Sequence, residues 1–132
     1  MGKRVLLCDD EIHILRAMEF KLKKAGYEVE IASDGEEAWE AIGKCKPDLL
    51  ITDCQMPRLN GVELIGRLRD DPQTADMPVF MLTAKGYELS SDLLFKQLRV
   101  LRLVSKPFSP RELLSWVDEA LQPSAVEAQR QA

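Results

Sequence analysis

The sequence has no long hydrophobic run among its 132 residues, few cysteines and no excess of positive charge. A membrane helix needs roughly 20 consecutive apolar residues, and no stretch approaches that length, so we expect no membrane insertion. Residues 1–4 lead directly into a short strand-like run, whereas a signal peptide has a longer apolar region. We therefore expect a cytoplasmic protein.

The three cysteines, Cys8, Cys45 and Cys54, are an odd number and show no CxxC or CxxH spacing. Such spacing is typical of a zinc site, and a larger even set is typical of a disulfide framework. Neither is indicated here. We expect buried or partly buried thiols instead.

Lys and Arg total 18 and Asp and Glu total 22, which gives a net charge of −4. A surface that neutralises the phosphates of DNA or RNA needs the opposite balance, so we expect no direct contact with nucleic acid. Hydrophobic residues make up 45% of the chain. This content and this length fit one globular domain, without room for a second full one.

Five short apolar runs alternate with amphipathic stretches. The runs cover residues 5–8, 28–32, 49–52, 79–82 and 101–104. This alternation predicts an α/β fold in which helices cover both faces of a parallel sheet. We expect a flavodoxin-like, doubly wound (βα)5 sandwich with five parallel strands in the order 2-1-3-4-5.

Apolar residues at helical spacing predict a helix after each strand. The expected helices contain residues 12–25, 38–42, 62–68, 89–98 and 113–121. Gly26 is a suitable stop for the first helix, and Asp34 can cap the second. Ser109 and Glu112 form the capping-box pattern before the last helix. We expect one domain over residues 1–122 and a polar tail or linker over 123–132.

Polar side chains follow four of the five runs, at the point where each predicted strand ends. They are Asp9 and Asp10, then Asp53, Thr83 and Lys106. Ligands of open α/β sheets bind at the carboxyl ends of the strands, near the point where the strand order reverses. Because the first and third strands are neighbours there, we expect three carboxylates within a few ångströms of one another.

Close carboxylates repel one another unless a cation neutralises them, and oxygen-only ligands favour a hard ion such as Mg²⁺ or Mn²⁺. Lys106 would supply positive charge to phosphoryl oxygens, and Thr83 a hydroxyl donor. An aspartate carboxylate can act as a nucleophile in phosphoryl transfer. A single aspartate at a strand end is often only a turn or capping residue, so the prediction depends on the whole set.

Four segments carry a resemblance to a known family: VLLCDDE, LLITDCQMPRLNGVEL, VFMLTA and SKPFSPREL. In this order and spacing they resemble the receiver domains of two-component response regulators, of the chemotaxis-regulator type. The resemblance implies that Asp53 is phosphorylated. It implies that Mg²⁺ is held by Asp10 and Asp53, by the backbone carbonyl of Gln55 and, through water, by Asp9.

The resemblance also implies roles at the fourth and fifth strands. Thr83 matches the switch hydroxyl that contacts the phosphoryl group, and Ala84 matches the small residue beside it. Lys106 matches the lysine that pairs with the phosphate. The peptide bond between Lys106 and Pro107 is a candidate for the cis form. Gln55 and Lys85 match positions that flank the attacking water, so we expect them to tune the lifetime of the acyl phosphate.

Two positions depart from the family pattern. Leu103 stands where Tyr or Phe is usual, three residues before the lysine, and Arg99 and Val100 replace a small Gly-Ala-like pair. Leucine has neither a ring nor a hydroxyl to exchange with the switch threonine. We therefore expect a weakened or altered switch on the face formed by the fourth helix, the fifth strand and the last helix.

The predicted function is that of a signalling module, not of an enzyme, although it would catalyse its own phosphorylation and dephosphorylation. The phosphodonor would be a sensor histidine kinase or a histidine phosphotransfer protein, and the downstream protein target and the oligomeric state stay open. Because no output segment is recognisable after Gln122, the chain either acts through partner docking or is part of a longer regulator.

Two alternatives remain from the sequence. A small phosphatase with an aspartate nucleophile normally needs a general acid two residues after the nucleophile, and Gln55 cannot serve. A receiver-like scaffold that binds a partner without phosphorylation is compatible with Leu103, although the complete set of acidic residues, threonine and lysine argues against it.

Overall fold

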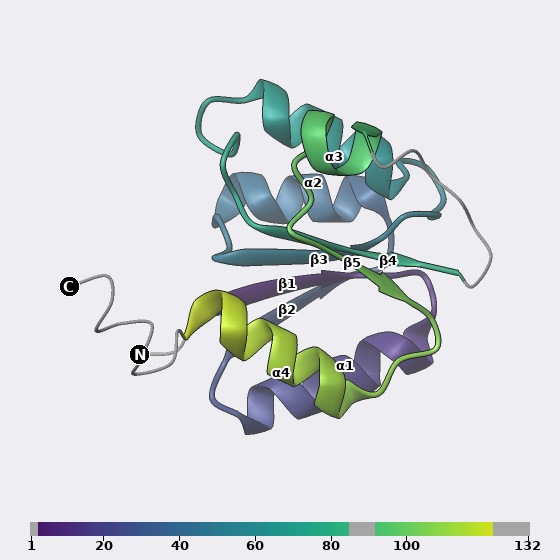
Figure 1. Cartoon of the computed structure of the whole chain (residues 1–132), viewed down its shortest axis with the longest axis vertical. Helices are drawn as coiled ribbons and strands as arrows, with labels where there is room; N and C mark the ends of the chain where they lie inside the picture. Colours follow the sequence, from purple (N-terminus) through teal and green to yellow (C-terminus); the bar gives the residue numbers. More distant parts are fainter. Residues whose placement is uncertain (1–2, 85–91, 123–132) are drawn as a thin grey trace.

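The structure is a computed structural model that describes residues 3–84 and 92–122 (Figure 1). Its strands are β1 (Arg4–Cys8), β2 (Glu28–Ala32), β3 (Leu49–Asp53), β4 (Val79–Thr83) and β5 (Arg102–Ser105). Its helices are α1 (Ile12–Lys24), α2 (Gly35–Lys44), α3 (Gly61–Asp70), η1 (Asp92–Gln97) and α4 (Pro110–Leu121). Strands and helices therefore alternate along the chain, as the sequence predicts.

All five strands are parallel and form one sheet in the order β2-β1-β3-β4-β5. The predicted flavodoxin-like strand order is confirmed. The strand order reverses between β1 and β3, which lie side by side although a strand and two helices separate them in the sequence. This reversal creates a crevice at the carboxyl ends of the two strands.

Two helical layers cover the sheet (Figure 1): α1 and α4 lie on one face, and α2, α3 and η1 lie on the other. Successive strand residues point to opposite faces, so one strand supplies both cores. In β1, Val5 and Leu7 pack with α1 and α4, whereas Leu6 and Cys8 pack on the opposite side. Every residue of β3 and β4 is buried, as expected for central strands of a parallel sheet.

Side-chain caps fix the starts of three helices. The Asp34 side chain accepts a hydrogen bond from the backbone N–H of Glu37 at the start of α2, and Ser109 with Glu112 forms the predicted capping box of α4. A further capping box, formed by Asn60 and Glu63, begins α3 and was not predicted from the sequence. It begins α3 after the loop over residues 54–60.

The structure differs from the sequence predictions in two places. The segment predicted as an α-helix over residues 89–98 is π-helical in its described part, η1, and Leu89 lies outside the described residues. Cys45 is exposed, because α2 ends immediately before it, whereas Cys8 and Cys54 are buried. The expected tail over residues 123–132 also lies outside the description. Among the helices described, none has the length and apolar character needed to cross a membrane.

Candidate functional site

Three strands deliver polar residues to one edge of the sheet. Asp9 directly follows β1, Asp53 ends β3, and Lys106 directly follows β5. The strand register places these ends level, since Cys8 pairs with Thr52 in the neighbouring strand. The crevice at the reversal of strand order therefore collects these three side chains from distant parts of the sequence.

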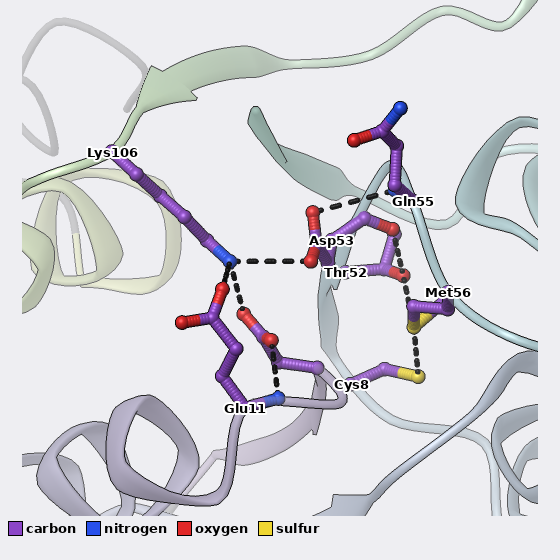
Figure 2. Close-up of polar contacts among 8 residues, drawn as sticks. Cys8, Glu11, Thr52, Asp53, Gln55, Met56 and Lys106 are labelled. Carbon is purple, nitrogen blue, oxygen red and sulfur yellow. Dashed lines mark hydrogen bonds and ion pairs between the residues drawn. The ribbon is translucent and has the colours of Figure 1, made fainter. Parts of the chain in front are cut away.

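Lys106 binds this group together (Figure 2). Its Nζ lies 2.9 Å from Asp9 Oδ2, 3.0 Å from Glu11 Oε1 and 3.2 Å from Asp53 Oδ2. The Lys106 side chain is only 13% exposed, so these ion pairs are partly shielded from water. A partly buried lysine that contacts three carboxylates is held in one position.

Four carboxylates, those of Asp9, Asp10, Glu11 and Asp53, have oxygens within 4.8 Å of one another. Asp9 is fully buried and Asp53 nearly so, while Asp10 and Glu11 are exposed. One ammonium cannot balance four carboxylates, and the donor set consists of oxygen alone. These residues therefore fit a hard divalent cation better than a soft one.

Burial and charge shift two pKa values in the site. Burial raises the pKa of Asp9, although the backbone N–H of Glu11 and the ammonium of Lys106 oppose that rise. Burial alone would lower the pKa of Lys106, but the carboxylates of Asp9 and Glu11 outweigh it and hold this pKa above its ordinary value. Lys106 is thus cationic at neutral pH.

The loop after β3 fits closely around Asp53. The backbone N–H of Gln55 donates a hydrogen bond of 3.4 Å to Asp53 Oδ1, as Figure 2 shows. A Cβ atom at Gly61 would lie only 2.2 Å from the carbonyl oxygen of Asp53, so the loop requires glycine there. Arg58, in the same loop, adopts a left-handed conformation with φ of 69°. The loop therefore orients the Asp53 carboxylate towards Lys106.

A second group of polar contacts lies beside the acidic cluster, on the α2–α3 face of the sheet (Figure 2). The thiol of Cys8 donates to the carbonyl oxygen of Asp34 and contacts Met56 Sδ, and Thr52 Oγ1 lies 3.9 Å from the same sulfur. Cys8 and Met56 belong to the apolar core on that face. These contacts connect the ends of β1 and β3 to Met56 in the loop after β3.

Thr83 ends β4 and is buried, and the exposed Ala84 follows it. The backbone N–H of Lys106 donates a hydrogen bond of 2.7 Å to the carbonyl oxygen of Thr83, so the two residues lie next to each other. The Lys106–Pro107 peptide bond is cis. Lys85 lies outside the described residues.

Leu103, the departure noted at the fifth strand, lies on β5 at the edge of the sheet and is 39% exposed. It does not enter either apolar core. Its side chain therefore lies partly in solvent.

Glu11 is the site residue that the sequence predictions omit. It directly follows the acidic pair Asp9–Asp10 and occupies the N-cap position of α1. The only signal was a third consecutive acidic residue. Its approach to Lys106, 95 residues away, depends on the turn from β1 into α1 and could not be read from local spacing.

An apolar groove of about 550 Å³ opens beside the site, between α1 and the segment after β5. Lys106 and Glu11 stand at its polar end, and Ile14, Met18 and Phe108 contribute apolar surface. The groove therefore borders the acidic site at Glu11 and Lys106.

The fold and the acidic cluster define a flavodoxin-like α/β domain with an acidic site at the carboxyl ends of its strands. The family model of the response regulator receiver domain matches residues 5–118. This chain belongs to the response regulator receiver domain family. It is thus a receiver of two-component signalling, a module that accepts a phosphoryl group and switches conformation, and neither the phosphatase nor the scaffold alternative is favoured.

Two relatives are transcriptional regulatory proteins by name. The alkaline phosphatase synthesis transcriptional regulatory protein PhoP of Bacillus subtilis is 39% identical over 128 residues, which are 97% of this chain and 52% of that protein. The phosphate regulon transcriptional regulatory protein PhoB of Pseudomonas aeruginosa is 39% identical over 115 residues, 87% of this chain and 50% of that protein. The chain spans about half the length of these relatives.

Solved structures of similar chains agree with the fold. The chemotaxis response regulator CheY4 of Vibrio cholerae has a TM-score of 0.83 at 33% identity and covers 92% of this chain and 100% of its own. A response regulator from Chloroflexus aurantiacus has a TM-score of 0.82 at 36% identity, over 92% of this chain and 98% of its own. The similarity extends across almost the whole described domain.

Proposed function

We propose that Asp53 is the phosphoacceptor and that it receives its phosphoryl group from a phosphohistidine. The observation that carries this proposal is the ammonium of Lys106, which lies 3.2 Å from Asp53 Oδ2 and 2.9 Å from Asp9 Oδ2 within a cluster of carboxylates. A nucleophilic carboxylate, a fixed cation and a metal-binding acidic cluster are the parts that phosphoryl transfer to an aspartate needs.

In the transfer step a carboxylate oxygen of Asp53 attacks the phosphorus atom. The bond between phosphorus and the donor's imidazole nitrogen breaks, and that nitrogen keeps the electron pair. The product is an aspartyl phosphate. Lys106 pairs with a phosphoryl oxygen and so stabilises the charge that the transferred group brings into the crevice.

Asp10 and Asp53, together with the backbone carbonyl of Gln55 and, through water, Asp9, would hold Mg²⁺ or Mn²⁺. The ion would neutralise phosphoryl oxygens and offset the repulsion among the carboxylates. The buried Asp9 Oδ2 supports this assignment, because within the described part of the chain it accepts no hydrogen bond and has only the ion pair with Lys106.

Self-catalysed hydrolysis would end the signal. A water molecule attacks the phosphorus atom, the bond to Asp53 breaks, and inorganic phosphate leaves while the carboxylate is restored. Gln55 is exposed two residues after Asp53, at the mouth of the site, and we propose that it and Lys85 tune this rate. Replacement of both by Ala should change the dephosphorylation rate, and an unchanged rate would refute their role.

The switch would begin at Thr83, whose neighbour Ala84 leaves room for its side chain to reach the phosphoryl group. Leu103 would transmit less of this movement than an aromatic residue, because it is already partly in solvent. The output would be a shift in the population of a conformation that a protein partner recognises.

The phosphodonor would be a sensor histidine kinase or a histidine phosphotransfer protein. It would bind at the apolar groove beside Lys106. A protein target is more consistent with the net charge of −4 than a nucleic acid is. We place this chemistry in the cytoplasm, which fits the absence of any disulfide among the three cysteines described.

Intact mass spectrometry tests the proposal. The protein is incubated with acetyl phosphate in the presence or absence of Mg²⁺, alongside Asp53→Asn. We expect one phosphate adduct that needs Mg²⁺ and is lost in the variant. An adduct that persists in Asp53→Asn, or no adduct under any condition, would contradict it.

A further inference from the structure

The ammonium of Lys106 lies among three carboxylates. Its Nζ contacts Asp9 Oδ2 at 2.9 Å, Glu11 Oε1 at 3.0 Å and Asp53 Oδ2 at 3.2 Å. An ammonium group has three hydrogens to donate. Two of them are donated, to Glu11 and Asp53, and Asp9 holds the ammonium through an ion pair without a hydrogen bond. A phosphoryl oxygen that approaches Asp53 must therefore compete with these carboxylates for the ammonium.

The three carboxylates differ in how easily they can leave. The side chain of Asp9 is 0% exposed and that of Asp53 is 9% exposed, whereas that of Glu11 is 58% exposed. Asp9 is also fixed by the backbone N–H of Glu11, which donates to its Oδ1 at 2.9 Å. Glu11 alone can exchange the ammonium for water, because its carboxylate already reaches the solvent.

We propose that Glu11 is a positioning residue that holds Lys106 in the unphosphorylated protein and releases it when a phosphoryl group reaches Asp53. This inference rests on the proposed function, since Lys106 must meet that group. Glu11 thereby competes with the phosphoryl oxygens for one hydrogen of the ammonium. The strength of the Glu11–Lys106 pair sets part of the affinity of the site for the phosphoryl group.

Glu11 is suited to substitution. It occupies the N-cap position of α1, but its side chain makes no capping hydrogen bond, so its replacement leaves the start of the helix unchanged. Glu11→Gln removes the charge and keeps the length. Glu11→Asp keeps the charge but is one methylene shorter, and Lys106 cannot follow it because Asp9 and Asp53 hold the ammonium.

The two variants distinguish loss of the Glu11–Lys106 ion pair from loss of the negative charge at position 11. Binding of beryllofluoride, a phosphoryl mimic, is measured by calorimetry in the presence of Mg²⁺ for the wild type and both variants. An exposed ion pair changes an equilibrium by up to about fivefold, so we expect both variants to bind beryllofluoride about two- to fivefold more tightly. The melting temperature of each protein without beryllofluoride checks that neither variant disturbs the fold.

Tighter binding by both variants supports the proposal. Tighter binding by Glu11→Gln alone overturns it, because that pattern reports repulsion by a nearby charge. Equal binding by all three proteins also overturns it, while the wild-type adduct at Asp53 leaves the proposed function standing. A wild type that binds neither beryllofluoride nor phosphate overturns both.

Discussion

At the scale of single residues, Asp9 places an ionisable carboxyl in the buried interior, where its charged form opposes folding. The carboxyl is fully buried, and burial raises its pKa despite the nearby ammonium of Lys106. A buried acid with a raised pKa binds its proton more tightly in the folded state than in the unfolded state. The ionised form therefore lowers the stability of the domain, and its value lies in the chemistry of the site.

We predict that Asp9→Asn stabilises the protein in a pH-dependent way. Below about pH 4 the carboxyl is protonated in both states, so the variant has little advantage there. As the pH rises from the ordinary aspartate pKa through the raised pKa of Asp9, the wild type loses stability relative to the variant. Urea unfolding across this range measures the difference, and a difference that shrinks with rising pH would contradict the account.

Gly61 is the second decisive residue, because it sets how closely the loop can approach Asp53. A Cβ atom at this position would meet the Asp53 carbonyl oxygen at 2.2 Å and Cys54 Cα at 2.9 Å, and neither backbone atom can move aside easily. We predict that Gly61→Ala lowers the free energy of unfolding by about 1–3 kcal/mol and slows phosphorylation.

Gly66 provides the matched control in the same helix. A Cβ atom there meets nothing within 4 Å, and alanine is the better helix former by up to about 1 kcal/mol. Gly66→Ala should therefore be neutral or stabilising and should leave the phosphorylation rate unchanged. Equal effects of the two alanines in thermal melts and phosphorylation assays would show that the contact with Asp53 is unimportant.

At the scale of elements, side-chain hydrogen bonds from α3 hold the residues that follow η1. The guanidinium of Arg69, on α3, donates to the carbonyl oxygens of Leu98 at 2.7 Å and Arg99 at 3.3 Å. It also donates to those of Thr74 and Ala75. Arg99 itself adopts a left-handed φ of 53°, where the family pattern would have a small residue. Arg69 thus joins α3, the loop before β4 and the turn into β5.

We predict that Arg69→Ala lowers the free energy of unfolding by about 2–3 kcal/mol, because several carbonyl groups lose a charged donor. Amide hydrogen exchange should first speed up between η1 and β5. Arg67→Ala is the control, since Arg67 is exposed and lies over the ring of Trp39, a contact of about 0.5–1 kcal/mol. A similar loss in both variants would refute the fastening role of Arg69.

The same elements limit what the switch can transmit. Leu103 is partly exposed on β5, and Leu94 of η1 is buried in the core. We predict that beryllofluoride produces large amide NMR shifts at Asp53 and Thr83 but only small ones at Leu103 and Leu94. Large shifts at both leucines would show that the pathway to η1 and β5 is intact without an aromatic residue.

At the scale of the whole molecule, sequence periodicity and turn chemistry were enough for most of the fold. β2 was predicted to the residue, and the other strands to within one residue at either end, because short apolar runs bounded by polar residues are clear signals. The α-helical form predicted for the fourth helix failed, since spacing alone does not distinguish i+4 from i+5 hydrogen bonding in a short segment.

The site was predictable to the extent that it is built from strand ends. Asp9, Asp53 and Lys106 follow or end strands whose neighbours are fixed by the fold class, so their meeting could be inferred. Glu11 and the close fit of Gly61 against Asp53 depend on how particular turns run, and no local pattern specifies that.

The acidic edge also predicts how the whole domain responds to ions. A ligand that binds only the folded state raises stability, by about 2.7 kcal/mol at 100 times its dissociation constant. We predict that Mg²⁺ raises the melting temperature in a saturable way, and that NaCl at matched ionic strength does not. Equal effects of the two salts would mean that the cluster of four carboxylates does not hold a divalent ion.

The central claim is that Asp53 carries the phosphate, and borohydride trapping tests it most directly. Borohydride reduces an aspartyl phosphate to homoserine, which peptide mass spectrometry locates in the sequence after treatment with acetyl phosphate and Mg²⁺. We predict homoserine at position 53 and unmodified residues at Asp9 and Asp10. Homoserine at either of those positions, with an unmodified Asp53, would contradict the account.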